Sequence, residues 1–419
     1  MRELAWSEDV AATVAELRAF APPPAAVRAA VTTIVGDVRA RGDAAVREHS
    51  LRLDGVELAE DYREPPERMG ERLEALAPGV RAALELAARN IRAYHRSEVA
   101  AAWRETLPQG QVVGQEVVPM AVAGLYVPGG LANYPSSVLM TAIPAQVAGV
   151  VRVVVCSPPR EGGGAAEGVA AACALLGVDG LYPIGGAQAV AAMAFGTEQV
   201  PRCDVIVGPG NAYVTEAKRQ VMGEVAIDGL AGPSEVLIIA DQAGEPSWLA
   251  ADLLAHAEHG SGSMACLADI GGTLAAPVTA AVGELAAELG IATGNVAIVA
   301  CPDRAAAVAL SNAFAPEHLE LHCTDAGALV PEIRNAGAVF VGPHAATAFA
   351  DYAAGSNHVL PTGGSARFSQ GLSVAAFQKR MAVVELDAAA AAALADPVAV
   401  IAEEEGLRAH ARSARLRGR

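Results

Sequence analysis

The sequence predicts an α/β protein whose strands form two doubly wound parallel sheets. Short runs of β-branched residues alternate with alanine-rich helical stretches, which is typical of βαβ units. These runs are 151–156, 204–207, 236–240, 296–300 and 338–341. They are almost wholly apolar, as expected of strands that are buried on both faces. A chain of 419 residues is too long for one ordinary core, so we divide the strands between two sheets.

Helices are predicted on both sides of the strand region. Apolar side chains recur at helical spacing over 27–38, and Gly42 follows as a typical helix stop. The helical pattern continues through 84–91, and the alanine-rich stretch 388–395 predicts helix in the last forty residues. The glycine- and proline-rich segment 229–233 predicts the joint between the two sheets.

The charge balance weighs against a nucleic-acid partner. The chain has 30 basic and 47 acidic residues and a formal net charge of −17, whereas phosphate binding needs clustered lysine and arginine. The basic residues at 408–419 fit a solvated helix end. The acidic N-terminus resembles no export signal. The apolar run 136–156 is interrupted by Pro144, Gln146 and Arg152, so we expect no membrane span.

The six cysteines show no CxxC spacing, and most lie within apolar segments. They fit reduced core thiols of a cytoplasmic protein. The alternative is a catalytic thiolate, for which Cys323 beside His322 is the candidate.

Three glycine-rich turns follow apolar runs, at 126–130, 185–188 and 208–211. Two of them lead into helical patterns, an arrangement that exposes backbone N–H groups to an anion such as a dinucleotide. Ordinary tight turns remain the alternative for each. A formal GxGxxA at 260–265 follows a helix and precedes a strand. This is the reverse of the dinucleotide-binding context, so we reject it.

The segment around His256 and His259 is the strongest candidate for metal binding. The two imidazoles lie three residues apart at the end of a predicted helix, so both can reach one ion. Core or surface histidines are the alternative. Asp351 and His410 add a carboxylate and a third imidazole if the fold brings them near, and such a set suits zinc.

Two further motifs offer groups for proton transfer. Glu317 and His318 follow Pro316 and precede an alternating segment, and an exposed acidic loop is the alternative interpretation. His358 lies in the glycine- and proline-bounded loop 355–362, the kind of loop that often carries function on a rigid scaffold.

Taken in their order along the sequence, the motifs resemble those of the histidinol dehydrogenase family over nearly the whole chain. The matching segments are 38–43, 126–130, 134–140, 185–189, 207–211, 231–236, 257–259, 316–318, 358–362 and 405–407. A series of this length is far more specific than any single glycine motif. The resemblance implies oxidation of L-histidinol to L-histidine in two NAD-dependent steps through the aldehyde, the last step of histidine biosynthesis.

The resemblance also implies roles for individual residues. His318 would be the general base and Glu317 would activate water. One zinc ion per subunit would be held by His256, His259, Asp351 and His410. The substrate contacts would be Ser234, His256, His259, His318, Asp351, His358, Glu405 and His410. Tyr126, Gln188 and Asn211 would contact the dinucleotide.

The implied architecture has two Rossmann-like doubly wound domains that lack the usual glycine fingerprint, a helical N-terminal region and an extended helical C-terminal tail. Its parts would be 1–23 with 105–124, then 24–104 with 125–230, then 231–372, and the tail 373–419. In the family this tail crosses to the partner subunit. We therefore expect a homodimer whose active sites are shared through Glu405 and His410, with no nucleic-acid or membrane partner.

One departure from the family pattern concerns the metal site. The family usually has glutamine at the position of His256, so an imidazole replaces an amide. Two outcomes are open: His256 binds the metal, or it does not fit and the geometry of the substrate shifts. We favour binding, because an imidazole suits zinc. Two alternatives to histidinol oxidation stay open. One is a related zinc- and NAD-dependent dehydrogenase of another small polar alcohol, such as a sulfonated diol. The other is a non-catalytic metal- or nucleotide-binding paralogue.

Overall fold

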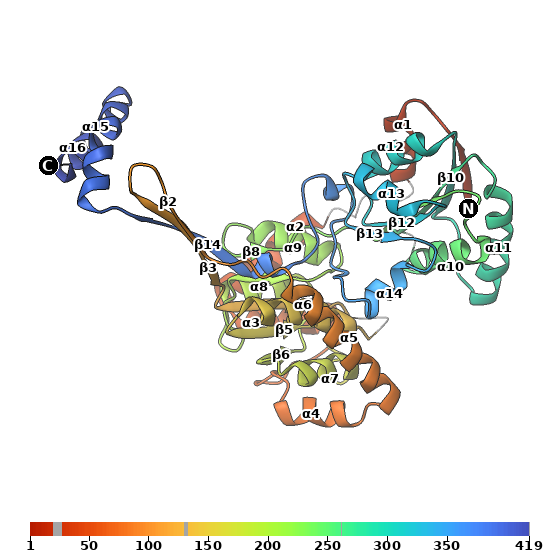
Figure 1. Cartoon of the computed structure of the whole chain (residues 1–419). Coiled ribbons are helices and arrows are strands. Elements are labelled where there is room, and N and C mark those ends of the chain that lie inside the picture. The colour runs from red at the N-terminus through yellow and green to blue at the C-terminus, as the bar shows by residue number, and fades with distance from the viewer. Residues whose placement is uncertain (20–26, 130–132, 261, 419) are drawn as a thin grey trace.

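The computed structural model describes residues 1–19, 27–129, 133–260 and 262–418, and it has two parallel sheets and one antiparallel sheet (Figure 1). Gly130 and the predicted boundary between residues 23 and 24 lie outside the described residues. The strands are β1 (Arg2–Ala5), β2 (Trp103–Thr106), β3 (Val112–Pro119), β4 (Val122–Tyr126), β5 (Arg152–Cys156), β6 (Gly180–Tyr182), β7 (Val205–Val207), β8 (Ala226–Ile227), β9 (Glu235–Ala240), β10 (Met264–Ile270), β11 (Val296–Cys301), β12 (His318–His322), β13 (Ala338–Val341) and β14 (Gln378–Glu385).

The α-helices of the described chain cover the parallel sheets, and the last two of them lie in the C-terminal arm, residues 378–418. They are α1 (Val10–Arg18), α2 (Arg28–Arg41), α3 (Asp43–Asp54), α4 (Pro66–Glu74), α5 (Pro78–Arg96), α6 (Pro135–Ala148), α7 (Glu167–Leu176), α8 (Gly186–Phe195), α9 (Ala212–Val221), α10 (Pro246–Ala257), α11 (Ala275–Leu289), α12 (Arg304–Phe314), α13 (Ala326–Leu329), α14 (Thr347–Tyr352), α15 (Ala388–Glu404) and α16 (Arg408–Arg417).

The first parallel sheet has the strand order β6-β5-β4-β7-β8. Successive side chains point to opposite faces, so Val155 packs under α6 and α7 while Val154 packs under α2 and α8. The order of the strands reverses between β4 and β7. The carboxyl ends of these two strands therefore form a topological switch point, where sheets of this class bind ligands.

The second parallel sheet has the order β1-β11-β10-β9-β12-β13. Helices α10 and α11 cover one face, and α1 and α12 cover the other. Residues 229–233 connect β8 in the first sheet to β9 in the second. This short connection places the carboxyl edge of the first sheet beside the amino edge of the second.

A three-stranded antiparallel sheet, β14-β3-β2, leads to the C-terminal arm. Helices α15 and α16 pack on each other at the end of this sheet, away from both parallel sheets (Figure 1). Large apolar side chains on the arm are exposed, among them Val384, Val400 and Ile401, each at 62%.

The predicted α/β class and its parallel sheets are confirmed. The five apolar runs form β5, β7, β9, β11 and β13, and the helix expected over 27–38 is α2 with Gly42 at its end. The N-terminal hundred residues are mostly helical, but Arg2–Ala5 forms β1, which pairs with β11. The division into domains stays a prediction.

The six cysteines are free and buried. Burial raises the pKa of Cys323 to about 11, and its Sγ lies 3.5 Å from the carbonyl oxygen of Ile239. A thiol in this state is a poor nucleophile, which argues against the catalytic alternative for Cys323. Within the described ranges, no helix is long and apolar enough to span a bilayer.

Candidate active site

The predicted catalytic residues lie at the amino edge of the second sheet, where β9 and β12 begin. His318 is paired in register with Val236, so Glu317 and Ser234 lie at the starts of neighbouring strands. Before β12, Ala315 ends α12 with a positive φ of 50°, a conformation that non-glycine residues rarely adopt. This turn directs the chain from α12 into Glu317 and His318. Such backbone strain is commonly retained at functional sites.

Glu317 is fixed by two hydrogen bonds from the start of β9. The hydroxyl of Ser234 donates to Oε2 at 2.8 Å, and the backbone N–H of Glu235 donates to the same oxygen at 2.9 Å. The side chain is buried, and Nδ1 of His318 lies 3.5 Å from Oε2. Both hydrogen bonds engage Oε2, which leaves Oε1 as the atom for a ligand.

His318 is held through Nδ1, and its Nε2 faces Asp351. Nδ1 lies 3.2 Å from the carbonyl oxygen of Glu235, and Nε2 lies 3.6 Å from Oδ1 of Asp351. The ring stacks on Phe340 at a centroid separation of 5.9 Å. Burial lowers the pKa of His318, but the Glu317 and Asp351 carboxylates outweigh it and raise the pKa to about 10. In the protein without a bound metal, His318 is therefore protonated at neutral pH.

His256 lies on α10 and is neutral. Burial and the neighbouring His318 lower its pKa to about 4. Its Nε2 lies 3.3 Å from Nδ1 of His318, and its Nδ1 lies 3.3 Å from the carbonyl oxygen of Asp252. His259 follows the helix end and is exposed, with its ring centroid 6.2 Å from that of His256.

Asp351 and His358 complete this group from α14 and the loop that follows it. The pKa of Asp351 is lowered, because the attraction of His318 outweighs the effect of burial. Nδ1 of His358 donates to the carbonyl oxygen of Asp351 at 2.9 Å. The structure thus brings Ser234, His256, Glu317, His318, Asp351 and His358 together, with His259 at their margin.

Glu405 and His410 do not join this group within one chain. Glu405 follows α15 and His410 lies in α16, so both are on the distant arm (Figure 1). Both are exposed. The fourth predicted metal ligand is therefore absent from the site in the single subunit.

The sequence did not reveal the contact between Arg18 and Glu235. Arg18 at the end of α1 forms an ion pair with Glu235 and donates to the carbonyl oxygen of Phe314 at 2.7 Å. The backbone N–H of Gly363 also donates to Glu235 Oε1, at 3.2 Å. Two segments that are distant in sequence thus hold Glu235 at the start of β9, and Phe314 in turn holds Arg18. No local pattern around Arg18 signals the partner.

The predicted dinucleotide residues lie at the carboxyl edge of the first sheet. The hydroxyl of Tyr126 accepts from the N–H of Gly186 at 3.1 Å, which joins two of the three glycine turns. Nε2 of Gln188 donates to Asp54 at 3.1 Å, while its buried Oε1 has no hydrogen-bond partner in the part of the chain that the structure describes. Asn211 caps α9 through Oδ1. This edge is the topological switch point of the sheet.

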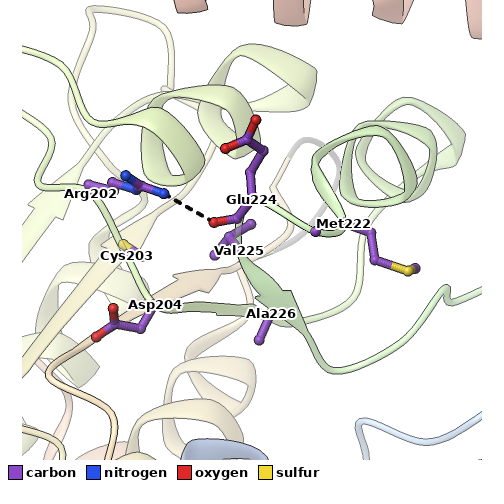
Figure 2. A pocket seen from close by; sticks show the side chains of 8 residues that line it. Arg202, Cys203, Asp204, Met222, Glu224, Val225 and Ala226 are labelled. Carbon is purple, nitrogen blue, oxygen red and sulfur yellow. Dashed lines mark hydrogen bonds between the residues drawn. The ribbon is translucent and has the colours of Figure 1, made fainter. Parts of the chain in front are cut away.

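A cavity of about 450 Å³ lies beside Asn211, the one predicted site residue in its lining. Asn211 and its neighbours line one side, and Gly232 and Pro233, just before Ser234, line another. A separate cavity of about 570 Å³ lies among Arg202, Asp204 and Glu224, at the opposite edge of the first sheet (Figure 2). It contains none of the predicted site residues.

Another buried polar cluster lies deeper, beside β12. Asp252, Glu320 and His322 each offer a metal-ligand atom, and these atoms lie within 4.8 Å of one another. The predicted set of His256, His259 and Asp351 is less compact than this in the single chain. Burial and the nearby Glu320 raise the pKa of Asp252 to about 7.

Comparison with known proteins identifies the family of this chain. The sequence model for histidinol dehydrogenase matches residues 22–418. The histidinol dehydrogenase of Pseudomonas aeruginosa is 47% identical over 397 residues, which cover 92% of this chain and 90% of the relative. The chain belongs to the histidinol dehydrogenase family. The family member of Rhizobium meliloti is 46% identical over 404 residues, which cover 93% and 92% of the two chains.

A solved histidinol dehydrogenase shares the whole architecture. The crystal structure from Elizabethkingia anophelis superposes with a TM-score of 0.93 at 32% identity, covering 100% of this chain and 98% of that one. An acetylating aldehyde dehydrogenase from Geobacillus thermoglucosidasius reaches a TM-score of 0.51 at 15% identity, over 91% and 99% of the chains, which shows likeness of fold alone. Membership of the histidinol dehydrogenase family makes this chain an oxidoreductase of histidine biosynthesis.

Proposed function

We propose that this chain oxidises L-histidinol to L-histidine through the aldehyde, in two steps that each reduce one NAD and that depend on one zinc ion per subunit. The observation that carries the proposal is the convergence of Glu317, His318 and Asp351 at the amino edge of the second sheet. Support also comes from the adjacent cavity, which reaches Asn211 at the switch point of the first sheet. In this proposal the hydride acceptor binds on the side of Asn211, and the substrate binds on the side of His318.

His318 is suited to accept the proton of the alcohol. The carbonyl oxygen of Glu235 accepts from Nδ1, so Nε2 is the basic atom of the neutral ring. This nitrogen has no hydrogen-bond partner among the described residues, although it is buried. As hydride leaves the carbinol carbon, Nε2 takes the hydroxyl proton, and the aldehyde forms.

Glu317 is suited to the second oxidation, which needs an added oxygen atom. Ser234 and the N–H of Glu235 hold Oε2, and Oε1 accepts a proton from water as that water attacks the aldehyde. His318 releases its first proton to solvent, so that it can accept a second one as hydride leaves the resulting hydrate. Two neighbouring groups thus divide the work of base and water activation.

The zinc ligands we propose are His256, His259, Asp351 and the partner's His410. The donor chemistry fits: His256 is buried and neutral, and Asp351 is ionised with a cationic neighbour in His318. Zinc bound by these residues would supply a fixed positive charge that orients the amino alcohol. It would also pair with Asp351 in place of protonated His318, so that His318 could act as a base. Ser234, His358 and the partner's Glu405 contact the substrate in this proposal.

NAD is proposed to bind along the carboxyl edge of the first sheet, in contact with Tyr126, Gln188 and Asn211. Oε1 of Gln188 is a buried acceptor without a hydrogen-bond partner among the described residues, and a ribose hydroxyl or an amide could donate to it. The exposed apolar residues of the arm and the absence of Glu405 and His410 from the intrachain site support a homodimer with shared sites. We place this biosynthetic enzyme in the cytoplasm.

NADH formation from L-histidinol tests the proposal. The purified protein should form two NADH per histidinol, lose this activity after treatment with a chelator, and regain it when zinc is added. A sulfonated diol serves as the control alcohol. No NADH from histidinol, or faster turnover of the diol, would refute the assigned substrate. Full activity after removal of the metal would refute the zinc requirement.

A further inference from the structure

A stripe of polar side chains runs along one face of β12 and begins with the proposed base, His318. His318, Glu320 and His322 alternate with two leucines, so the three polar groups share a face of the strand. The leucines pack in the core on the side of α12. The polar stripe faces α10 and α14, and all three of its side chains are buried.

Glu320 is the centre of the stripe and is fully buried. Its Oε1 accepts from the backbone N–H and from the hydroxyl of Thr347, both at 2.7 Å. Its Oε2 lies 3.2 Å from Nε2 of His322. Burial alone would raise the pKa of Glu320, but hydrogen bonds from His322 and Thr347 keep it below the ordinary value. A charged carboxylate is therefore held in the interior by specific partners.

Thr347 links this carboxylate to the proposed metal site. It is the first residue of α14, and its N–H is one of the amides that a helix cannot satisfy internally. Asp351 lies four residues later, on the same face of the helix. Glu320 therefore fixes the helix that carries Asp351 against the strand that carries His318, whose Nε2 lies 3.6 Å from Oδ1 of Asp351.

The other end of the stripe reaches α10. Nε2 of His322 lies 3.9 Å from Oδ2 of Asp252, and Asp252 precedes His256 by one helical turn. The backbone carbonyl of Asp252 contacts Nδ1 of His256 at 3.3 Å. The stripe thus connects the three elements that carry His256, His318 and Asp351.

We propose that Glu320 is a positioning residue for the site: by holding α14 against β12 it sets the carboxylate of Asp351 in place for zinc and for His318. The inference rests on the proposed function. A buried carboxylate is costly, and well-packed apolar residues often stabilise a core as well or better. Its hydrogen bonds to the helix that carries a metal ligand give Glu320 a function that an apolar side chain cannot supply.

Thr347→Val tests this link with little change of shape. It removes one hydrogen bond to a charged acceptor, so the zinc dissociation constant should rise about tenfold. The KM for histidinol should rise with it, while kcat at saturating zinc and substrate stays within about twofold. Thr141→Val is the matched control. Thr141 is also buried, and its hydroxyl donates to a backbone carbonyl within α6, which covers the first parallel sheet. It should leave zinc affinity and KM unchanged.

Variants of Glu320 supply a second measurement. Glu320→Gln retains an acceptor oxygen for Thr347, so it should recover most of the zinc affinity that Glu320→Ala loses. Equal losses in both variants, or equal behaviour of Thr347→Val and Thr141→Val, would overturn the positioning role. Two zinc ions per wild-type subunit and one in Glu320→Gln would also overturn it, because the cluster would then itself hold a cation. Failure of the wild type to oxidise histidinol refutes the proposed function, and the zinc comparison still decides the role of Glu320.

Discussion

The imidazoles of His256 and His318 lie in contact, with Nε2 of the first 3.3 Å from Nδ1 of the second and ring centroids 5.0 Å apart. One ring is neutral with a pKa of about 4, and the other is cationic with a pKa of about 10. The two environments divide the rings into a neutral nitrogen donor suited to a metal and a proton carrier. This division of roles is the basis of the first two predictions.

His256→Gln should weaken zinc binding by roughly tenfold or more, because an amide oxygen is a poorer zinc donor than an imidazole. Chelator competition on the purified protein measures the change, and turnover of histidinol is followed in parallel. His49→Gln is the control, since His49 lies on α3 beside the first sheet. Unchanged zinc affinity together with unchanged turnover in His256→Gln would remove His256 from the ligand set.

The stability of the metal-free protein should fall as pH rises from 6.5 towards 10. The unfolded chain has a histidine pKa of about 6.5, whereas folded His318 keeps its proton up to a pKa of about 10. The stability that protonated His318 adds to the folded state is therefore complete below pH 6.5. It declines by up to about 1.4 kcal/mol per pH unit as the pH rises, and it is lost above pH 10. Urea unfolding at pH 6.5, 8 and 9.5 measures it. His318→Gln should flatten the profile, and an equal slope in both proteins would contradict the assignment.

His318→Gln should also lower kcat by about 10²- to 10⁴-fold, the usual contribution of a general base. Zinc content should stay near that of the wild type, because His318 is not among the proposed ligands. Single-turnover measurement of NADH formation, with metal analysis of the same sample, separates the two effects. Ordinary turnover in this variant would exclude His318 as the base.

The glycine turn before α9 is held by a buried ion pair. Lys218 pairs with Asp228, and its Nζ donates to the carbonyl oxygen of Gly208 at 2.9 Å. The carboxylate of Asp228 accepts from the N–H of the same glycine at 2.7 Å. A Cβ atom on Gly208 would clash with the carbonyl oxygen of Tyr126, so the turn lies tightly against β4. The pair therefore fixes the turn that leads to Asn211.

Lys218→Met should destabilise the fold by about 3–5 kcal/mol, because it leaves Asp228 as an unpaired buried charge. The KM for NAD should rise more than the KM for histidinol, since the turn before Asn211 loses its support. The chain has one other lysine, Lys379 on β14, whose replacement by methionine is the control. Equal effects of the two substitutions on stability and on the KM for NAD would contradict the role of the pair.

The sequence predicted the elements whose signal is local. Uniformly apolar runs identified central strands such as β9 and β11, and the spacing of His256 and His259 placed them at the end of one helix. The alternation in β12 is typical of a strand with one solvated face. The structure buries both faces, because the polar face meets α10 and α14. No local pattern distinguishes a polar face covered by a partner helix from one covered by water.

Contacts between distant segments could not be predicted in the same way. β1 is a short, partly charged segment that joins the second sheet across nearly 300 residues, and only its register with β11 defines it as a strand. Arg18 meets Glu235, and Glu320 meets Thr347, through tertiary packing alone. In the proposed dimer, His410 reaches the site only from a second subunit, and no local pattern in one chain specifies such a contact.

Mixing two inactive variants tests the shared active site. In the proposed dimer, His318→Gln damages the site on its own subunit, whereas His410→Gln damages the site of the partner. In a heterodimer of the two, one site carries both changes and the other carries neither. Random exchange of subunits makes about half of the dimers mixed, and each mixed dimer has one intact site out of two. About a quarter of the wild-type activity should therefore return. His318→Gln mixed with Glu317→Gln is the control. Each subunit supplies both of these residues to its own site, so every site in the mixed dimer carries one damaged residue and the mixture should stay inactive. If each site were complete within one chain, neither mixture would recover activity, and the His410 assignment to a partner would fail.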